Sequence, residues 1–517
     1  MHNIMPSIYG LNFLEQSILS IIPEVVIIIF AFMVLFLTFF EKLAKGKNSY
    51  YLSLIGIGFS ILYVFMLSGR NLIGFYGSVV FNGYEVFLFI AILLSGFFAV
   101  LISKDYIENF DIPYPEYYSL ILFGISAMMF LVSSNNLIMV FISLEFMSIC
   151  AYILTGYIKG STRSTEAALK YFILGAFASG FLLFGSVFIY AAVGHLNLYA
   201  IHTYLENISY GSPNGLSRLT GISEYLSAGL LLFLVGLAFK MSLFPFHAWT
   251  PDAYDGAPTP VTTFMATGIK VAAFAIFLRI YSLIYNFNII NFNDILWLLA
   301  VLSMTFGNIA ALLSSNIKRL LAYSSIAQAG YILIGIIGGG LYGYSGTLFY
   351  LLSYIFMTAG AFVIVIIFEN SDLISLDIKK YTGLGYKRPF IAAAMSFFLL
   401  SLAGIPVTSG FMGKFYVFSS AIKSGYNWLV FIALLNSAFA AYYYIKIIVK
   451  MYMPDNEDSV NSCVIAEGKN YGIINGSIGD GLLITILICL FFTLLMGIYP
   501  QIFINFANYS AASLWRI

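Results

Sequence analysis

Apolar segments long enough to cross a lipid bilayer recur along almost the whole chain. A helix needs about 20 mostly apolar residues to span about 30 Å of hydrocarbon, and fourteen such segments can be placed in the sequence. Only 9% of the residues are charged, against about 25% in an ordinary soluble domain. None of the segments has the short apolar core and cleavage site of a removable signal peptide. The sequence therefore predicts a polytopic integral membrane protein.

The predicted spans are helices, because the period-2 alternation that marks the strands of a membrane barrel is absent. An all-α, polytopic membrane protein of about 14 transmembrane helices is therefore expected. The centres of these helices are predicted near Ile29, Phe59, Leu93, Phe123, Met147, Leu182, Val235, Ala272, Met304, Leu333, Phe356, Leu400, Ala438 and Leu487.

The distribution of the 24 Lys and Arg residues predicts the orientation of the chain. Loops on one side of the membrane hold most of them, namely Lys42, Lys45, Lys47, Lys104, Lys159, Arg163, Lys318, Arg319, Lys379, Lys380, Lys387, Arg388, Lys450 and Lys469. Loops on the opposite side hold only Arg70, Arg218, Arg279, Lys423 and Arg516. By the positive-inside rule the first side is cytoplasmic, and an even number of spans then places both termini outside.

The remaining basic residues lie inside predicted spans, and all are lysines: Lys170, Lys240, Lys270, Lys414 and Lys446. A lysine near a helix end can extend to the interface at little cost, which fits Lys446. Lys170 can form an exposed helical pair with Glu166, four residues earlier. Neither explanation fits the other three, because a charged lysine in the middle of a span costs upward of about 2.5 kcal/mol. For Lys240, Lys270 and Lys414 we favour a function over static ion pairing.

Glu145, in "FISLEFMSICAYILTG", is the acidic counterpart of these lysines. It falls in the middle of a span, and Ser148 and Tyr152 follow on the same helical face. We favour a titrating partner over one half of a static salt bridge, because no other carboxylate lies as centrally in a span. Glu24 is expected in the first turn of its helix after Pro23, where interfacial capping explains it at least as well as a function.

Buried lysines and carboxylates of this kind can exchange protons. Removal from water favours the neutral form of each group, whereas a nearby opposite charge favours the charged form. Movement of a partner toward or away from a lysine therefore changes whether the lysine holds its proton. This is the physical basis for a proton relay along buried Lys and Glu residues.

Helix-breaking residues accompany two of the central lysines. Pro245 follows Lys240, and its ring is expected to distort the turn beside that lysine. The segment "SLAGIPVTSGFMGKFYVF" places Pro406 and two glycines ahead of Lys414. Irregular backbone at membrane depth is tolerated only where it faces protein or a wet cavity, so water is expected to reach Lys240. Broken helices are therefore predicted in spans 7 and 12.

A faint internal similarity suggests that the chain contains a repeat. The segments that begin at Leu131 and Leu312 share the sequences SSN and YIL. Two five-helix units, spans 4–8 and 9–13, would then have opposite membrane orientation, as an inverted-repeat transporter requires. The expected divisions are 1–116 with spans 1–3, 117–285 with the first repeat, 286–453 with the second repeat, and 454–517 with a polar loop and span 14. The segment 456–479 has no function that the sequence explains.

The chain carries no recognisable redox or metal-binding motif. Cys150, Cys463 and Cys489 are isolated, so they offer neither a disulfide framework nor a cluster for zinc or iron–sulfur. The four histidines lack the i, i+4 pairing that holds a metal on a helix. The glycines of "GIIGGGLYGYSG" are expected in a loop, since no βαβ unit surrounds them. We therefore expect no cofactor or metal in this chain.

Two long motifs resemble those of a known family. The segments "FKMSLFPFHAWTPDAYDGAPTPVTTFMATGIKVAAFAIFLR" and "SLAGIPVTSGFMGKF" are similar to the antiporter-like membrane subunits of respiratory complex I, and among them to the N type, subunit 2 in organelles. The resemblance covers nearly all of the chain. The lysine in span 12 argues against the M type, which carries a glutamate there.

The resemblance implies proton translocation across an energy-transducing membrane, driven by electron transfer from NADH to quinone in other subunits. Carried over by position, Glu145 matches the span-5 glutamate, Lys240 its partner lysine in span 7, Lys270 the central connecting lysine in span 8, and Lys414 the span-12 lysine near the exit side. Lys170 matches a further lysine of the N type. The expected partners are other membrane-arm and hydrophilic-arm subunits and the lipid bilayer, with no nucleic acid. NADH, FMN, iron–sulfur clusters and quinone are expected in those partner subunits, and a bacterial inner membrane is the expected location.

Two alternatives share these features. A subunit of a multisubunit cation/proton antiporter would have the same fold, and the sequence does not show which ion moves. A relative of complex I that takes electrons from ferredoxin or a deazaflavin would use similar membrane subunits. An ordinary solute transporter is less favoured, because no half-helix N-termini aimed at a central anionic substrate are evident.

Overall fold

The computed structural model describes residues 13–40, 47–110, 114–210, 215–284, 287, 291–369, 376–453, 473–474 and 477–514. The polar segment 456–479 lies mostly outside these residues. Almost all of the described chain is helical, so the predicted all-α fold is confirmed. In chain order the first elements are α1 Phe13–Phe36, η1 Leu37–Phe39, α3 Asn48–Leu67, β1 Leu72–Gly74, η2 Phe75–Gly77, β2 Val79–Phe81, α4 Gly83–Phe110, α5 Tyr114–Ser133, α6 Leu137–Thr155, α7 Thr162–Val193, α8 Leu198–Tyr210 and α9 Gly215–Met241.

The chain continues with shorter pieces among the long helices. These elements are α10 Trp249–Gly256, α11 Thr259–Phe264, the π-helical turn η3 Met265–Ile269, α12 Lys270–Ile284, α13 Phe292–Leu313, α14 Ile317–Gly338, α15 Gly340–Phe368, η6 Ile378–Tyr381, α16 Leu384–Lys387, α17 Pro389–Ala403, α18 Ser409–Lys423, α19 Asn427–Tyr452, β3 Ile473–Ile474, β4 Ser477–Ile478, α21 Asp480–Ile498 and α22 Gln501–Ser513. The strands form two short antiparallel pairs, β1 with β2 and β3 with β4.

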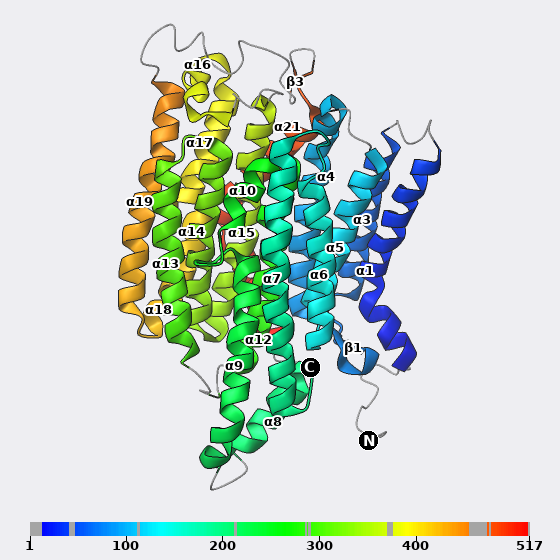
Figure 1. The fold of residues 1–517 in the computed structure, drawn as a ribbon. Coiled ribbons are helices and arrows are strands. Elements are labelled where there is room, and N and C mark those ends of the chain that lie inside the picture. Colours follow the sequence, from blue (N-terminus) through cyan, green and yellow to red (C-terminus); the bar gives the residue numbers. More distant parts are fainter. Residues whose placement is uncertain are drawn as a thin grey trace.

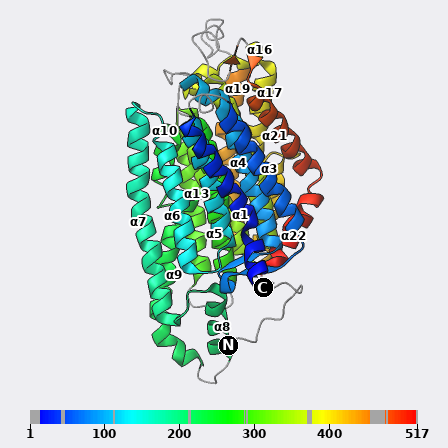
Figure 2. The ribbon, with the colours of Figure 1, turned by 90° about the vertical axis from the view of Figure 1, so that its right-hand side faces the viewer.

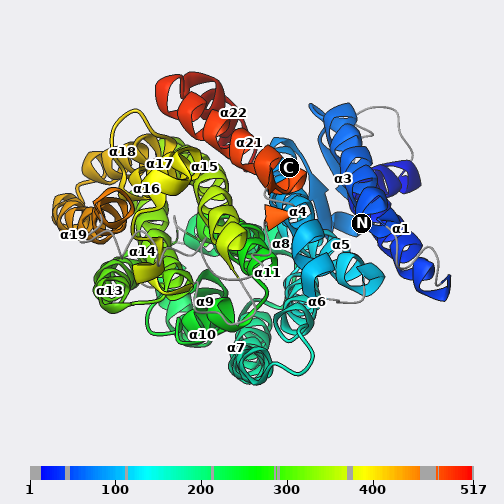
Figure 3. The same cartoon turned by 90° about the horizontal axis from the view of Figure 1, so that it is seen from above.

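Thirteen helices of the described chain are long and apolar enough to cross a membrane. They contain all the predicted span centres except the one near Leu400, which falls in the shorter helix α17. The helices stand side by side (Figure 1). Seen along their axes, α1 and α3 lie at one end of an elongated bundle, and α13, α18 and α19 lie at the other (Figure 3).

The helices in the middle of the bundle are the most deeply buried. The most apolar stretches of α11–α12 and α15 are buried throughout, and that of α14 almost throughout. Helices α7 and α19, in contrast, expose long rows of apolar side chains. The start of α1 and the last helix, α22, lie at the same end of the bundle (Figure 2). Polar groups on α12, α14 and α15 are therefore shielded from the hydrocarbon by other helices.

An asparagine cap begins both α6 and α14. The side chain of Asn136 accepts a hydrogen bond from Ile138 N at 2.9 Å, and that of Asn316 accepts one from Lys318 N at 2.8 Å. Each cap also forms a β-bridge to a later loop, at Asn197 and Asp377 respectively. These side chains satisfy amides that the first turn of a helix leaves without partners. Asn316 is the last residue of the shared sequence SSN, whereas Asn136 directly follows the SSN of residues 133–135. The two helix starts are therefore similar but one position apart, and the inverted repeat stays a prediction.

The break predicted beside Lys240 is present, but it begins before Pro245. Helix α9 ends at Met241, and the chain re-forms a helix only at Trp249. The indole nitrogen of Trp249 donates to Phe239 O at 2.9 Å, and Leu243 N donates to Ala238 O at 2.9 Å. Helix α9 therefore ends at Met241, the residue whose carbonyl Pro245 cannot bond, as expected, and protein groups bind the carbonyls of Ala238 and Phe239 in the last turns.

The second break separates α17 from α18, as predicted for span 12. Gly404 closes α17 in a left-handed conformation, with φ of 87°, which favours glycine. Gly410, in the first turn of α18, lies against the backbone of Ser401, and its amide donates to Ser401 Oγ at 3.2 Å. A Cβ atom at Gly410 would overlap Ser401 O. The two half-helices therefore cross in direct backbone contact.

Replacing Gly410 with alanine is expected to destabilise the protein by about 1–3 kcal/mol, the usual cost of overpacking. The added methyl group meets backbone atoms, which cannot rotate away. The measurement is thermal unfolding of the purified protein. Gly180→Ala in α7 is the matched control, because a Cβ there meets nothing within 4 Å. Equal melting temperatures for the two variants would contradict the contact.

Three charged residues lie deeper than the sequence suggested. Arg279 and Lys318 were expected in loops, but they lie in α12 and α14 with only 3% and 1% of their surfaces exposed. Arg279 forms a buried ion pair with Glu85 of α4. Glu24 was expected in a first turn, yet α1 begins at Phe13 and Glu24 lies fully buried in its middle. Packing of neighbouring helices, which hydropathy does not report, explains all three differences.

Candidate functional site

The three central lysines predicted from the sequence are all buried. Lys240 and Lys270 each expose 1% of their surface, and Lys414 exposes 4%. Each lies at an irregular point of the backbone: Lys240 in the last turn of α9, Lys270 directly after the π-helical turn η3, and Lys414 on α18 after the break. Irregular backbone in a membrane helix exposes polar groups that a straight helix would satisfy internally. The three sites therefore combine a cation with local backbone polarity.

Aromatic rings surround the ammonium group of Lys240. Its Nζ donates to Tyr152 OH at 3.2 Å. The same atom lies 5.2 Å from the ring centroid of Tyr152, 5.4 Å from that of Tyr171 and 5.3 Å from that of Phe239. Tyr171 in turn stacks on Trp249, with ring centroids 4.2 Å apart. The electron-rich faces of these rings attract a cation, so the site stabilises a charged lysine without a carboxylate in contact.

Glu145 and Tyr152 lie on the same face of α6, as their spacing predicted. Glu145 is half-buried, and its Oε1 has no hydrogen-bond partner among the described residues. No ion pair within 4.0 Å joins it to Lys240 in the part of the chain that the structure describes. The residue of α6 that contacts Lys240 is Tyr152, whose hydroxyl accepts a hydrogen bond from Lys240 Nζ. Gly175 leaves room for this hydroxyl, because a Cβ atom at position 175 would overlap it.

Lys270 is bound by the next helix of the bundle. Its Nζ donates to both the carbonyl oxygen and the hydroxyl of Ser325 on α14, each at 2.7 Å. The ring of Tyr354 on α15 lies beside it, with its centroid 5.6 Å from Nζ. The hydroxyl of Tyr354 is buried and has no hydrogen-bond partner among the described residues. Lys270 therefore connects α12 to α14 at the centre of the bundle.

One face of α14 carries polar side chains from Lys270 toward Lys414. Ser324, Gln328 and Tyr331 follow at helical spacing and share this face. In the structure Ser324 Oγ hydrogen-bonds Tyr444 OH, and Gln328 accepts a hydrogen bond from Tyr350 OH. Gln328 Nε2 also donates to Leu402 O at 2.9 Å, and Leu402 O is in turn bound by Lys414. Hydrogen bonds thus join Gln328 to Lys414 through Leu402 O, and Ser325, three residues before Gln328 on α14, is bound to Lys270.

Lys414 has a fuller set of acceptors than the other two lysines. Its Nζ donates to Leu402 O at 3.2 Å, Ala403 O at 2.8 Å and Ser437 Oγ at 3.1 Å. The two carbonyls belong to the C-terminal end of α17, where the helix dipole is negative. The ring centroid of Tyr331 lies 4.6 Å from Nζ. Three acceptors match the three N–H groups of an ammonium ion, so the structure shows Lys414 in a setting suited to its charged form.

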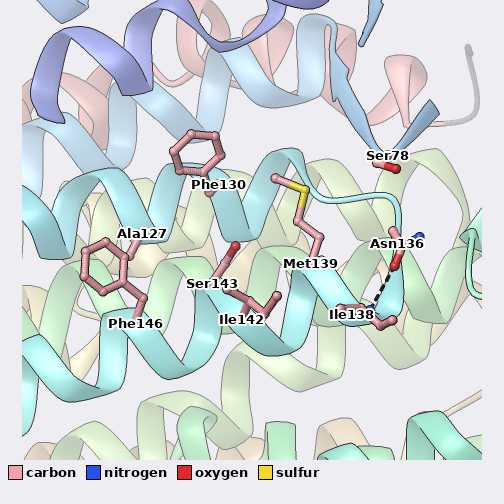
Figure 4. A pocket seen from close by; sticks show the side chains of 9 residues that line it. All are labelled: Ser78, Ala127, Phe130, Asn136, Ile138, Met139, Ile142, Ser143 and Phe146. Carbon is pink, nitrogen blue, oxygen red and sulfur yellow. Dashed lines mark hydrogen bonds between the residues drawn. The ribbon is translucent and has the colours of Figure 1, made fainter. Parts of the chain in front are cut away.

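A cavity of about 260 Å³ reaches Lys414 from between α18 and α19. Its lining is mostly apolar and includes Phe411, Phe415 and Leu434, with Ser437 and Lys414 as polar members. A larger groove of about 480 Å³ lies between α5 and α6, lined by Ala127, Phe130, Ile142, Phe146 and neighbouring residues (Figure 4). None of the candidate site residues lines this second groove.

Lys170 lies apart from the three buried lysines. It is 46% exposed and forms ion pairs with Glu166 at 2.7 Å and with Asp252 of α10 at 2.9 Å. The helical pair that its sequence spacing allowed is therefore present. Lys446 is exposed on α19, which agrees with its interpretation as an interfacial lysine.

Two candidate functional residues, Lys318 and Glu369, were not found from the sequence. They form a buried ion pair. The sequence did not indicate it, because both residues lie at the ends of predicted spans. The cap at Asn316 could have placed Lys318 in the first turn of a helix. Among the described residues no group of three or more His, Cys, Asp or Glu side chains could hold a metal ion. Buried lysine and carboxylate side chains can bind and release protons, so their arrangement here is suited to proton transfer.

The comparison with known proteins agrees with this chemistry. The family model of the NADH:quinone oxidoreductase/Mrp antiporter transmembrane proteins matches residues 134–440. The chain belongs to this family. It is 39% identical to an NADH-quinone oxidoreductase subunit N of Trichlorobacter lovleyi over 94% of this chain and 96% of that protein. It is 36% identical to the chloroplast NAD(P)H-quinone oxidoreductase subunit 2 of Mesostigma viride over 95% of each.

Solved structures of the family share the fold. A chain of respiratory complex I from Thermus thermophilus superimposes with a TM-score of 0.76 at 29% identity, covering 94% of this chain and all of that one. A chain of the Mrp complex from a Dietzia species gives a TM-score of 0.78 at 20% identity, over 97% of this chain and 98% of that one, which shows the fold alone. The range 134–440, which the family model matches, contains Glu145, Lys240, Lys270 and Lys414.

Proposed function

We propose that this chain is the proton-translocating N-type membrane subunit of an NADH:quinone oxidoreductase. The observation that carries the proposal is the set of three buried lysines, each beside polar or aromatic groups, in a member of this family. Buried cations in membrane helices are costly, and they mark ion and proton pathways. The relatives over nearly the full chain length are subunits of such an oxidoreductase.

In this proposal protons pass along the bundle in steps. Glu145 lies on the same face of α6 as Tyr152, and movement of its charge changes the proton affinity of Lys240. Lys270 then receives a proton at the centre, and the polar face of α14 connects it to Lys414. Lys414 releases the proton toward the outer side, next to the cavity between α18 and α19. Lys170 contributes a surface charge at the cytoplasmic end through its ion pair with Asp252.

The partners supply the energy for these steps. Other membrane-arm subunits and a hydrophilic arm with NADH, FMN, iron–sulfur clusters and quinone would carry out the electron transfer. The protein would lie in a bacterial inner membrane, with both termini outside, as the distribution of Lys and Arg indicates. A role in a multisubunit cation/proton antiporter is the second candidate, since the family model includes the Mrp antiporters.

Purification of the native complex distinguishes these candidates. Membership in an NADH:quinone oxidoreductase requires copurifying iron–sulfur subunits, and the reconstituted complex should take up protons while NADH reduces quinone. Proton uptake should continue when sodium is replaced by choline. A preparation that lacks iron–sulfur subunits and exchanges Na⁺ for H⁺ would establish the antiporter instead.

The variant Glu145→Gln is expected to lower coupled electron transfer while the complex still assembles. Glutamine keeps the shape of the side chain and removes the charge that tunes Lys240. Because Glu145 Oε1 has no hydrogen-bond partner among the described residues, the change leaves few broken contacts. The measurement is NADH-driven quinone reduction and proton uptake in vesicles, at equal amounts of assembled complex. Parental rates of both would exclude the proposed coupling of Glu145 to Lys240.

A further inference from the structure

A buried carboxylate outside the sites described above lies at the end of the bundle that the positive-inside rule assigns to the cytoplasm. Glu369 follows the last residue of α15 and exposes 1% of its surface. Its Oε1 lies 3.8 Å from Nζ of Lys318, which is equally buried, and accepts a hydrogen bond from Tyr106 OH at 3.4 Å. Its Oε2 accepts a hydrogen bond from Thr259 Oγ1. Four helices, α4, α11, α14 and α15, thus converge on this carboxylate.

A row of hydroxyl groups leads from Glu369 toward Lys270. Thr259, Thr263 and Thr267 are fully buried and occupy one face of α11 and η3, and Lys270 follows directly after η3. Thr263 Oγ1 donates to Thr259 O at 3.0 Å, and Thr267 Oγ1 donates to Thr263 O at 2.7 Å. Residues four positions apart rise about 6 Å along a helix, a gap short enough for one hydrogen-bonded water to span.

Side chains from neighbouring helices place further buried hydroxyls near this row. Ser95 Oγ of α4 hydrogen-bonds Thr267 Oγ1 at 2.6 Å. On α15, Thr358 and Tyr354 carry hydroxyls that are buried in the same interior. The ring of Tyr354 lies beside Lys270. Hydroxyl groups of three helices therefore line the interval between the carboxylate and the central lysine.

A graded series of charges connects Glu369 to the cytoplasmic surface. Arg319 is 45% exposed and donates from Nε to Asp255 Oδ2 at 2.9 Å. Asp255 is 8% exposed and is bound as well by Arg163 and by Asn316 Nδ2. Lys318, the neighbour of Arg319 on α14, donates to Ala257 O at 2.8 Å and lies beside Glu369. Exposure thus falls from the surface inward, from Arg319 through Asp255 to the buried pair.

We propose that Glu369 is the residue that takes up protons from the cytoplasmic side and passes them through the threonine row to Lys270, with Lys318 as its counter-charge. The proposal rests on the function proposed above and names its uptake route. The static alternative is a buried ion pair that only fixes α14 to α15. Breaking such a pair is costly, but it would not change the number of protons moved by each assembled complex.

The transfer involves protons only. A hydronium ion at the cytoplasmic surface gives its proton to the Glu369 carboxylate and becomes water. The new carboxylic O–H bond then breaks as the proton passes to the Thr259 hydroxyl, whose own proton moves onward through water and the next hydroxyls. The neutral amine of Lys270 gains an N–H bond at the end of the row. Glu369 is again a carboxylate, and no electron has moved.

The test uses the intact complex in vesicles with three forms of the chain: parent, Glu369→Gln and Glu369→Asp. Glutamine cannot carry the proton. At equal amounts of assembled complex, the number of protons taken up per electron pair is therefore expected to fall about tenfold, less than the roughly 100-fold or more that a positioned acid–base group contributes to a reaction rate. The solvent isotope effect on uptake should rise, since proton entry becomes rate-limiting. Aspartate should restore most of the uptake, because it keeps the ionisable group.

The matched control is Glu85→Gln, which also removes a buried carboxylate from an ion pair, at the opposite end of the bundle. It is expected to lower stability and leave the proton-to-electron ratio and the isotope effect at parental values. If Glu369→Gln behaves in the same way, Glu369 is structural and the uptake route is wrong. If the parental complex itself moves no protons with NADH, the proposed function fails first, and the two failures are thereby distinguished.

Discussion

Replacing Lys240 with arginine is expected to give an assembled complex that moves at least about tenfold fewer protons per electron pair, the order of loss expected when a proton-transfer group is removed. Arginine keeps the positive charge, and its planar guanidinium stacks well on aromatic rings such as those of Tyr152, Tyr171 and Phe239. Arginine does not release its proton at cellular pH, however. A permanent cation at this position should therefore keep the contacts with the aromatic rings but be unable to bind and release a proton in each pumping cycle.

The measurement is the number of protons moved per electron pair in reconstituted vesicles for the parent, Lys240→Arg and Lys240→His. Histidine, with an unperturbed pKa of about 6.5 in solution, can bind and release a proton and should restore part of the ratio. Lys446→Arg on the exposed side of α19 is the control and should pump as the parent does. A full parental ratio with Lys240→Arg would mean that Lys240 acts as a fixed charge and that protons travel by another route.

The central lysines could be found from the sequence because a charge inside a long apolar run is visible without any knowledge of packing. The same holds for the polar face of α14, since Ser324, Gln328 and Tyr331 follow helical spacing. Both helix breaks were also predicted from prolines and glycines. The sequence did not show the tertiary contacts at the end of α9, such as the one from Trp249 to Phe239 O.

Contacts between helices were the part that the sequence could not supply. Spacing along α6 aligned Glu145 with Tyr152, yet only the packing of α6 against α9 shows that the tyrosine hydroxyl reaches Lys240. Lys318 and Glu369 lie at the ends of hydrophobic runs, where an interfacial position is the ordinary expectation. Their burial results from the helices that converge there, which no single segment of the chain reveals.

Replacing Lys414 with methionine is expected to stop most proton release to the outer side while NADH-driven electron transfer loses its coupling. Methionine fills a similar volume without a charge. The carbonyls of Leu402 and Ala403 and the hydroxyl of Ser437 would then lose a common donor. Leaving a buried polar group without its partner costs about 1–3 kcal/mol, so some loss of stability at the α17–α18 break should accompany the loss of pumping.

Lys414→Arg separates the two effects, because it restores a donor to these acceptors and cannot release a proton. Stability should return toward the parental melting temperature, and proton release to the outer side should stay at least about tenfold below the parent, as for other losses of a proton-transfer group. Lys446→Met, in the adjacent helix α19, removes an exposed lysine and should leave both properties unchanged. If Lys414→Arg recovers stability and pumping together, Lys414 serves only to hold the broken helix, and the outer release step must be assigned to another group.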